Sequence, residues 1–162
     1  MRKLRNPYAA SGRPEYQCFA CSPNHPTGLK MQFWDDGDDV VAKWIPRKSL
    51  EGYTNVLHGG IQATLLDELA SWVIQTRCKT VGVTYSMEIT YRRPVLISAG
   101  EITLRGRVQE AESSVAIIET ELLGNDGKIC ATAILKYFLF DTEKATTEYF
   151  YPGADAFYEG MD

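Results

Sequence analysis

The stretch that decides the fold is residues 52–78, GYTNVLHGGIQATLLDELASWVIQTRC. Turn-forming residues open it, Gly59 and Gly60 follow, and the remainder is rich in apolar side chains as far as Cys78. These side chains recur every three or four residues, which is the period of an α-helix with a wide buried face. We therefore predict one long helix that begins at the glycines and is buried on most sides. Two interleaved rows carry the pattern: Ile61, Leu65, Leu69 and Trp72, and one position later Leu66, Ala70 and Val73.

Two carboxylates, Asp67 and Glu68, fall in the middle of this helix. A carboxylate there is costly unless it is paired, hydrated or used in chemistry. Thr64 and Ser71 share the helix face of Asp67, which makes a polar stripe. At the helix start, backbone N–H groups near Gly59 lack helical partners and lie at the positive end of the helix dipole. The predicted helix thus combines an anion-binding start with a carboxylate about 12 Å further along its axis.

The composition indicates one domain with its own core, because the chain has 162 residues of which 44% are apolar. A net charge of −4, without any run of Lys or Arg, argues against nucleic-acid binding. No apolar run approaches the ~20 residues of a membrane span, and no apolar segment follows the basic N-terminus as in a signal peptide. Four scattered cysteines do not make a disulfide scaffold. We expect a cytoplasmic protein with no membrane partner.

Alternation of apolar and polar side chains predicts β-strands on both sides of the helix. A hairpin is expected over residues 28–45, and no second helix is indicated after residue 78. One helix against an antiparallel sheet is an α+β arrangement in which the sheet curls around the helix. The later strands are expected at residues 80–93, 101–111, 114–123 and 128–140. The expected division is an irregular arm (1–27, with a helical turn near 15–19), a central domain (28–140) and an acidic, aromatic tail (141–162).

The strand expected at residues 80–93 has two distinct faces. Alternation places Val83, Tyr85 and Met87 on an apolar face. It places Thr84 and Ser86 together on the opposite, polar face.

Cys18 and Cys21 have the Cys-x-x-Cys spacing of redox and metal sites. A zinc site takes four ligands, and beyond His25 no second Cys or His pair follows at a useful spacing. A thioredoxin-type pair opens a helix in a βαβ unit, whereas this pair lies in a Pro-rich segment. We therefore expect packing cysteines and no metal, with a metal protein built on Cys18, Cys21 and His25 as a remote alternative.

The motif HGG at residues 58–60, followed by LLDE at residues 65–68 and flanked by strands, resembles the hotdog-fold acyl-CoA thioesterases. The nearest branch is the phenylacetate-degradation type. The resemblance covers residues 28–140, and the Cys-x-x-Cys and Asn-x-Pro-x-Gly-Leu order of residues 18–29 extends it upstream. It implies a hotdog fold, in which a curved antiparallel sheet wraps around one central helix. It also implies a thioesterase that needs no cofactor and works as a homodimer or homotetramer with its site at the subunit interface.

The resemblance further implies roles for individual residues. The catalytic carboxylate nine residues after the histidine is Asp67, as general base or nucleophile, and the Gly59 backbone N–H is the oxyanion donor. Glu68 lies about 100° around the helix from Asp67 and is favoured as a structural or interface residue, unless the two carboxylates exchange roles. The other implied site residues are Ser71 as a catalytic hydroxyl and His58, Gly60, Thr84 and Glu68 around the substrate.

Two classes of function follow. The lead interpretation is hydrolysis of an acyl-CoA to a free acid and CoA. Arg92 and Arg93 are candidates for its phosphates, and the equal alternative is that they form a solvated strand end. The rival is a non-catalytic acyl-CoA-binding or regulatory hotdog module. Some relatives carry Asn or Gln six residues before the histidine, and this chain has Gly52 there, which favours the rival. A hydratase is less favoured because the helix region has no Asp and His pair at hydratase spacing.

Overall fold

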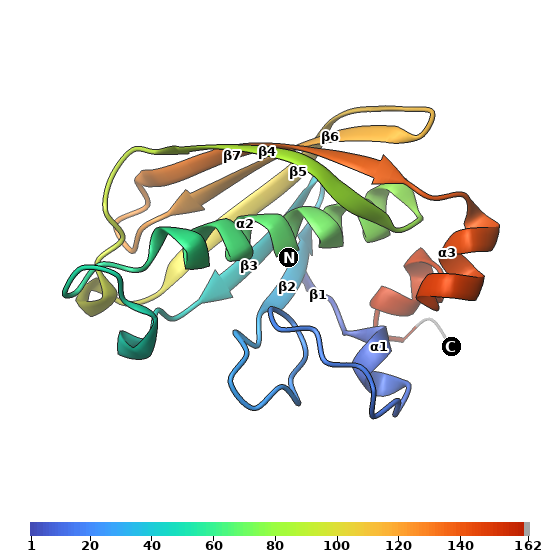
Figure 1. Ribbon diagram of the computed structural model, residues 1–162, viewed down its shortest axis with the longest axis horizontal. Coiled ribbons are helices and arrows are strands. Elements are labelled where there is room, and N and C mark those ends of the chain that lie inside the picture. The colour runs from blue at the N-terminus through green and yellow to red at the C-terminus, as the bar shows by residue number, and fades with distance from the viewer. Residues whose placement is uncertain (161–162) are drawn as a thin grey trace.

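The computed structural model describes residues 1–160, which form one seven-stranded antiparallel sheet curved over a central helix (Figure 1). The strand order is β1-β2-β3-β5-β6-β7-β4. The predicted α+β hotdog architecture is confirmed. The strands are β1 (Arg2–Lys3), β2 (Gln32–Asp36), β3 (Asp39–Trp44), β4 (Gly82–Tyr91), β5 (Ile102–Glu112), β6 (Val115–Leu123) and β7 (Ile129–Leu139); the α-helices are α1 (Pro7–Ala10), α2 (Gly59–Val73) and α3 (Thr142–Tyr149).

Helix α2 lies along the concave face of the sheet (Figure 1). It begins where predicted, and His58 caps it by accepting the N–H of Gly60 on Nδ1 at 2.9 Å. Strand β5 can approach α2 closely because Gly106 has no side chain; a Cβ there would lie 3.1 Å from Cγ of the fully buried Leu69. The helix continues as a π-helical turn over Ile74–Cys78. None of the helices within residues 1–160 has both the length and the apolar character that a bilayer span requires.

The predicted strands are found within a few residues of their expected ends. β2 and β3 are joined by the two residues Gly37 and Asp38, and the positive φ of Gly37, 71°, is one that glycine adopts without strain. The inner faces of the sheet are apolar: on β6, Ala116, Ile118 and Leu122 are fully buried. Alternation of buried and half-exposed residues along β6 therefore fixes which face covers α2.

Strand β4 departs from the prediction at one position. Its register against β7 shifts between Thr84 and Ser86, so Tyr85 is the extra residue of a β-bulge. Thr84 pairs with the buried Tyr137, whereas Ser86 pairs with the exposed Lys136. An extra residue reverses the alternation of faces, so Thr84 faces the helix. The prediction that Thr84 and Ser86 share one polar face is wrong for this reason.

The N-terminal arm is more ordered than expected. The helical turn lies at α1 rather than near residues 15–19, because the Asn6 side chain accepts the N–H groups of the first turn and Pro7 occupies its first position. β1 adds a short strand to the edge of β2, and the next residue, Leu4, is buried. The arm then runs beneath α2 (Figure 1).

The C-terminal tail packs onto the same end of the molecule. Its helix α3 was not predicted, since eight residues are too few for a clear period, and Asp141 caps it. Phe157 is fully buried and lies edge-on to Trp72 of α2, with 5.2 Å between ring centroids. Tyr158 forms a single β-bridge with Leu4 of the arm. The last two residues of the predicted tail, 161–162, lie outside the described residues.

Candidate active site

Asp67 lies where α2, β4 and β7 meet. Its Oδ1 accepts hydrogen bonds from the Thr84 hydroxyl at 2.7 Å and from the Tyr137 hydroxyl at 2.8 Å. Tyr137 is 2% exposed, and its burial together with the charge of Asp67 raises the pKa of Tyr137 far above its usual range. Tyr137 therefore keeps its proton and acts as a hydrogen-bond donor.

The two hydroxyls hold Asp67 by one oxygen. Among residues 1–160, the side-chain hydrogen bonds of Asp67 all go to Oδ1. The carboxylate is half-buried, so Oδ2 remains available to a water molecule or a substrate. A positioned carboxylate with one open oxygen suits a general base, which takes a proton from water, or a nucleophile, which attacks a carbonyl carbon.

The start of α2 presents a second feature, the backbone N–H of Gly59. The neighbouring N–H of Gly60 is occupied by His58. Within the described residues, no hydrogen bond is recorded for the N–H of Gly59, while its carbonyl accepts the Tyr91 hydroxyl at 2.8 Å. Gly59 thus offers a free donor at the positive end of a 15-residue helix, where an oxyanion is stabilised.

The glycine at position 59 is not required by the backbone. Gly59 is absent from the residues with positive φ, and a Cβ would lie 3.5 Å from the Tyr91 ring, an ordinary contact. Of the two properties that glycine brings, tolerance of unusual φ is not used here. Close approach of a ligand to the backbone is the property that remains.

Two cavities adjoin the helix start at Gly59. One of about 330 Å³ is lined by Gly52, Tyr53, His58 and Gly59, among others. A second, of about 290 Å³, is lined by Gly59 together with Arg92, Arg93 and others. Arg93 is paired with Asp126 at 2.9 Å, whereas no ion pair of Arg92 is recorded within residues 1–160. A cation therefore stands beside the predicted oxyanion donor.

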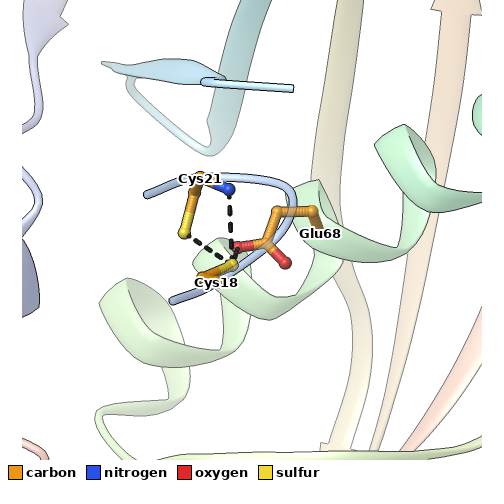
Figure 2. Close-up of side chains that lie close together, drawn as sticks. All are labelled: Cys18, Cys21 and Glu68. Carbon is orange, nitrogen blue, oxygen red and sulfur yellow. Dashed lines mark hydrogen bonds between the residues drawn. The ribbon is translucent and has the colours of Figure 1, made fainter. Parts of the chain in front are cut away.

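Ser71 and Glu68 are not joined to Asp67 by hydrogen bonds. The Ser71 hydroxyl accepts from the Gln75 amide at 3.2 Å, and both Ser71 and Glu68 line a cavity of about 420 Å³ between α2 and the arm. Burial raises the pKa of Glu68 to about 8. Glu68 faces Cys18 and Cys21 instead, as Figure 2 shows, and these three residues are the group in residues 1–160 that could hold a metal.

Of the predicted site residues, the structure brings Thr84 to Asp67 and His58 to Gly60, while Ser71 and Glu68 line another cavity and have no hydrogen bond to Asp67 recorded within residues 1–160. Tyr137 and Tyr91 were not singled out. Tyr137 lies 70 residues after Asp67 in an apolar strand, where a tyrosine is indistinguishable from a core aromatic residue. Only strand pairing reveals it, because Tyr137 is the partner of Thr84.

The chain matches known proteins over this same region. A family model of the thioesterase superfamily matches residues 54–131. An uncharacterised protein of Schizosaccharomyces pombe is 40% identical over 63 residues, which are 38% of this chain. The match spans 36% of that protein, so the chain is similar to little more than a third of its curated relative.

Solved structures show the same fold. A thioesterase from Haemophilus influenzae superposes with a TM-score of 0.65 at 18% identity, over 75% of this chain and 85% of that one. A hypothetical thioesterase from Streptococcus pneumoniae, solved with coenzyme A, superposes with a TM-score of 0.61 at 20% identity, over 67% and 87% of the two chains. At these identities the likeness is one of fold.

Proposed function

We propose that this chain, which matches the thioesterase superfamily over residues 54–131 and has the hotdog fold, hydrolyses the thioester of an acyl-CoA to a free acid and CoA. Within that superfamily we assign the chain, on its HGG and LLDE motifs, to the phenylacetate-degradation type. The observation that carries the proposal is the fixed carboxylate of Asp67, held at Oδ1 by Thr84 and Tyr137 with Oδ2 open.

The reaction needs two groups. Asp67 Oδ2 takes a proton from water while the water oxygen attacks the thioester carbon, or Oδ2 itself attacks and the resulting anhydride is then hydrolysed. In both routes the carbonyl oxygen becomes an oxyanion, which the Gly59 N–H stabilises. When the carbon–sulfur bond breaks, the CoA thiolate leaves and takes up a proton. Loss of one such oxyanion donor typically costs ~2.7–4 kcal/mol.

The two groups belong to different subunits in this proposal. On one helix, Gly59 and Asp67 are about 12 Å apart along the axis, too far for one thioester. Strand β4, ten residues long, forms one margin of the sheet, and its Val83 and Tyr85 are 45% and 78% exposed. A long apolar edge strand is a surface for pairing with another chain. We therefore assign β4 to a homodimer contact that brings the Gly59 of one subunit to the Asp67 of the other.

Arg92 suits the phosphates of CoA. It follows β4 and lines the cavity that Gly59 also lines, so a CoA whose thioester lies at Gly59 has its charged part beside a free guanidinium. The Streptococcus pneumoniae thioesterase of the same fold was solved with coenzyme A, which agrees with this class of ligand. A metal or cofactor takes no part in the proposed hydrolysis.

A second candidate function is acyl-CoA binding without turnover. Gly52 favours it, because this position lines the cavity beside Gly59 yet has no side-chain amide, such as that of Asn or Gln, to polarise a thioester. The two functions are separated by thiol release from a panel of short, medium and aromatic acyl-CoA esters. We expect turnover by the native protein and a loss of at least ~10³-fold in kcat on Asp67→Asn, with Glu119→Gln on the outer sheet as the matched control. Binding of CoA esters without any thiol release would establish the second function instead.

A further inference from the structure

The strongest feature outside the proposed catalytic centre is a cluster of Cys18, Cys21 and Glu68 (Figure 2). The two sulfurs are 3.1 Å apart, and Cys18 Sγ lies 3.5 Å from Glu68 Oε1. All three ligand atoms lie within 4.8 Å of one another. The cysteines come from the arm and the carboxylate from the middle of α2, 50 residues away.

Glu68 is a half-buried carboxylate for which no counter-charge is recorded within residues 1–160. No ion pair of Glu68 with any Lys, Arg or His is recorded for the part of the chain that the structure describes. Its recorded neighbours are the Cys18 thiol and the indole N–H of Trp72, which donates to Oε1 at 3.3 Å. Burying an ionised carboxylate is costly unless a cation or several donors compensate for the lost water.

Each of the two sulfurs has a neighbouring group that can donate a hydrogen bond to it. The backbone N–H of Cys21 donates to Cys18 Sγ at 3.3 Å, and the Tyr16 hydroxyl lies 3.0 Å from Cys21 Sγ, where it can donate to a thiolate. Donors fixed toward sulfur stabilise thiolates, the form in which cysteine binds metals.

We propose that Cys18 Sγ, Cys21 Sγ and the Glu68 carboxylate bind one zinc ion, with a fourth position open toward the cavity of about 420 Å³ beside them. Two thiolates and a carboxylate form a ligand set that zinc accepts, and a water molecule can complete the tetrahedron. Binding displaces the protons that the three groups carry, so the ion and its three negative ligands together carry one negative charge.

The observed distances fit this geometry with one movement. With Zn–S near ~2.3 Å and Zn–O near ~2.0 Å, a tetrahedral site places sulfur and oxygen ~3.5 Å apart, as Cys18 and Glu68 already are. The same site places two sulfurs ~3.8 Å apart, so zinc must widen the 3.1 Å separation of Cys18 and Cys21. The half-buried Cys18 has the cavity on one side and can move in that direction.

The expectation of no metal considered as ligands only Cys18, Cys21 and His25, which are close in sequence. It did not include Glu68, which reaches the two cysteines from α2. A disulfide between Cys18 and Cys21 is the other chemistry open to the pair. A disulfide would use the two sulfurs alone and would leave the Glu68 oxygen, 3.5 Å from Cys18 Sγ, without a role. The carboxylate therefore favours zinc over the disulfide.

The experiment measures the metal content of the full chain, purified under reduction without chelator. We expect about one zinc per chain in the native protein and less than about a tenth of that in Cys18→Ser and Cys21→Ser. Cys78→Ser, which changes a half-buried cysteine outside the cluster, should keep the native content. Competition with a chromophoric chelator should show zinc held at least ~10-fold more weakly by Glu68→Gln, and about 10-fold more weakly by Trp72→Phe, which removes the indole donor.

Two further measurements test whether the variants are folded and which atoms bind the zinc. Circular dichroism distinguishes lost ligands from lost fold in the cysteine variants. X-ray absorption of the zinc-loaded native protein should give two sulfur neighbours at ~2.3 Å. The proposal is overturned if metal-free, reduced native protein takes up no zinc, if zinc content is unchanged in both cysteine variants, or if thiol titration finds Cys18 and Cys21 joined as a disulfide in metal-free native protein.

Discussion

At the scale of single residues, the candidate site depends on one carboxylate oxygen. Thr84 and Tyr137 both donate to Asp67 Oδ1. Thr84 lies on the exposed edge strand, whereas Tyr137 lies within the sheet and is buried. Tyr137 is thus the more rigid of the two and sets the orientation of the carboxylate.

Tyr137→Phe should separate orientation from binding. The change removes one hydrogen bond to a charged group and leaves the ring in place, so kcat should fall about tenfold, which corresponds to ~1.4 kcal/mol, while KM changes little. Tyr151→Phe is the matched control, since its hydroxyl bonds the Gln75 carbonyl away from Asp67. Steady-state thiol release measures both variants. Native kcat in Tyr137→Phe would show that Tyr137 does not position Asp67.

Whether a site residue could be predicted from the sequence depends on how far away in sequence its partners lie. His58, Gly59 and Asp67 share one helix, and their spacing along it was predictable from the period alone. Tyr137 and Tyr91 were not, because each gains its role from a distant segment: Tyr137 from its pairing with Thr84 of β4, and Tyr91 from its hydrogen bond to the Gly59 carbonyl of α2. Glu68 illustrates the same limit: its helix position was predicted, but its neighbours come from an arm whose path no periodicity describes.

At the scale of elements, the bulge in β4 decides which side chain reaches α2. Sequence alternation predicted the strand and its length, and one extra residue at Tyr85 reversed the faces before it. Bulges have no strong sequence signal, since they depend on the partner strand. The result is a polar Thr84 opposite Asp67, with Met87 and Ile89 packed against the core further along.

The C-terminal tail also acts as an element of the core. Phe157 is fully buried against Trp72, and its carbonyl accepts the backbone N–H of Arg5 from the arm. Phe157→Ala should therefore lower the free energy of unfolding by ~3–5 kcal/mol in urea titrations. Phe150→Ala, which changes a 58% exposed ring in the same tail, should cost less than about 1 kcal/mol. Equal losses in the two variants would mean that the tail is not part of the core.

At the scale of the whole molecule, the proposed dimer makes a prediction about mixed subunits. Asp67→Asn and Gly59→Val chains, co-expressed with different tags and purified over both, give dimers with one intact site and one doubly altered site. We expect about half of the native activity from these mixed dimers. Each variant alone should be strongly impaired, Gly59→Val by ~10²–10³ in kcat. Gly59→Val should keep its fold, because a Cβ at this position meets Tyr91 at an ordinary 3.5 Å.

The outcome of mixing decides between two arrangements. Recovery of activity requires that Gly59 and Asp67 of one site come from different chains. Mixed dimers as inactive as the parent variants would place both groups of a site in one chain and contradict the proposed interface.

The two margins of the sheet are unequal, and this limits polymerisation. At one margin stands β4, ten residues long; at the other stands β1, two residues long, after which Leu4 is bridged to Tyr158 of the tail. When two chains join through β4, each uses the one long edge strand that its sheet has within residues 1–160. The margins left outside are too short, and too well covered by the tail, to recruit a third sheet. Pairing by strand addition therefore ends in a finite particle instead of a fibre.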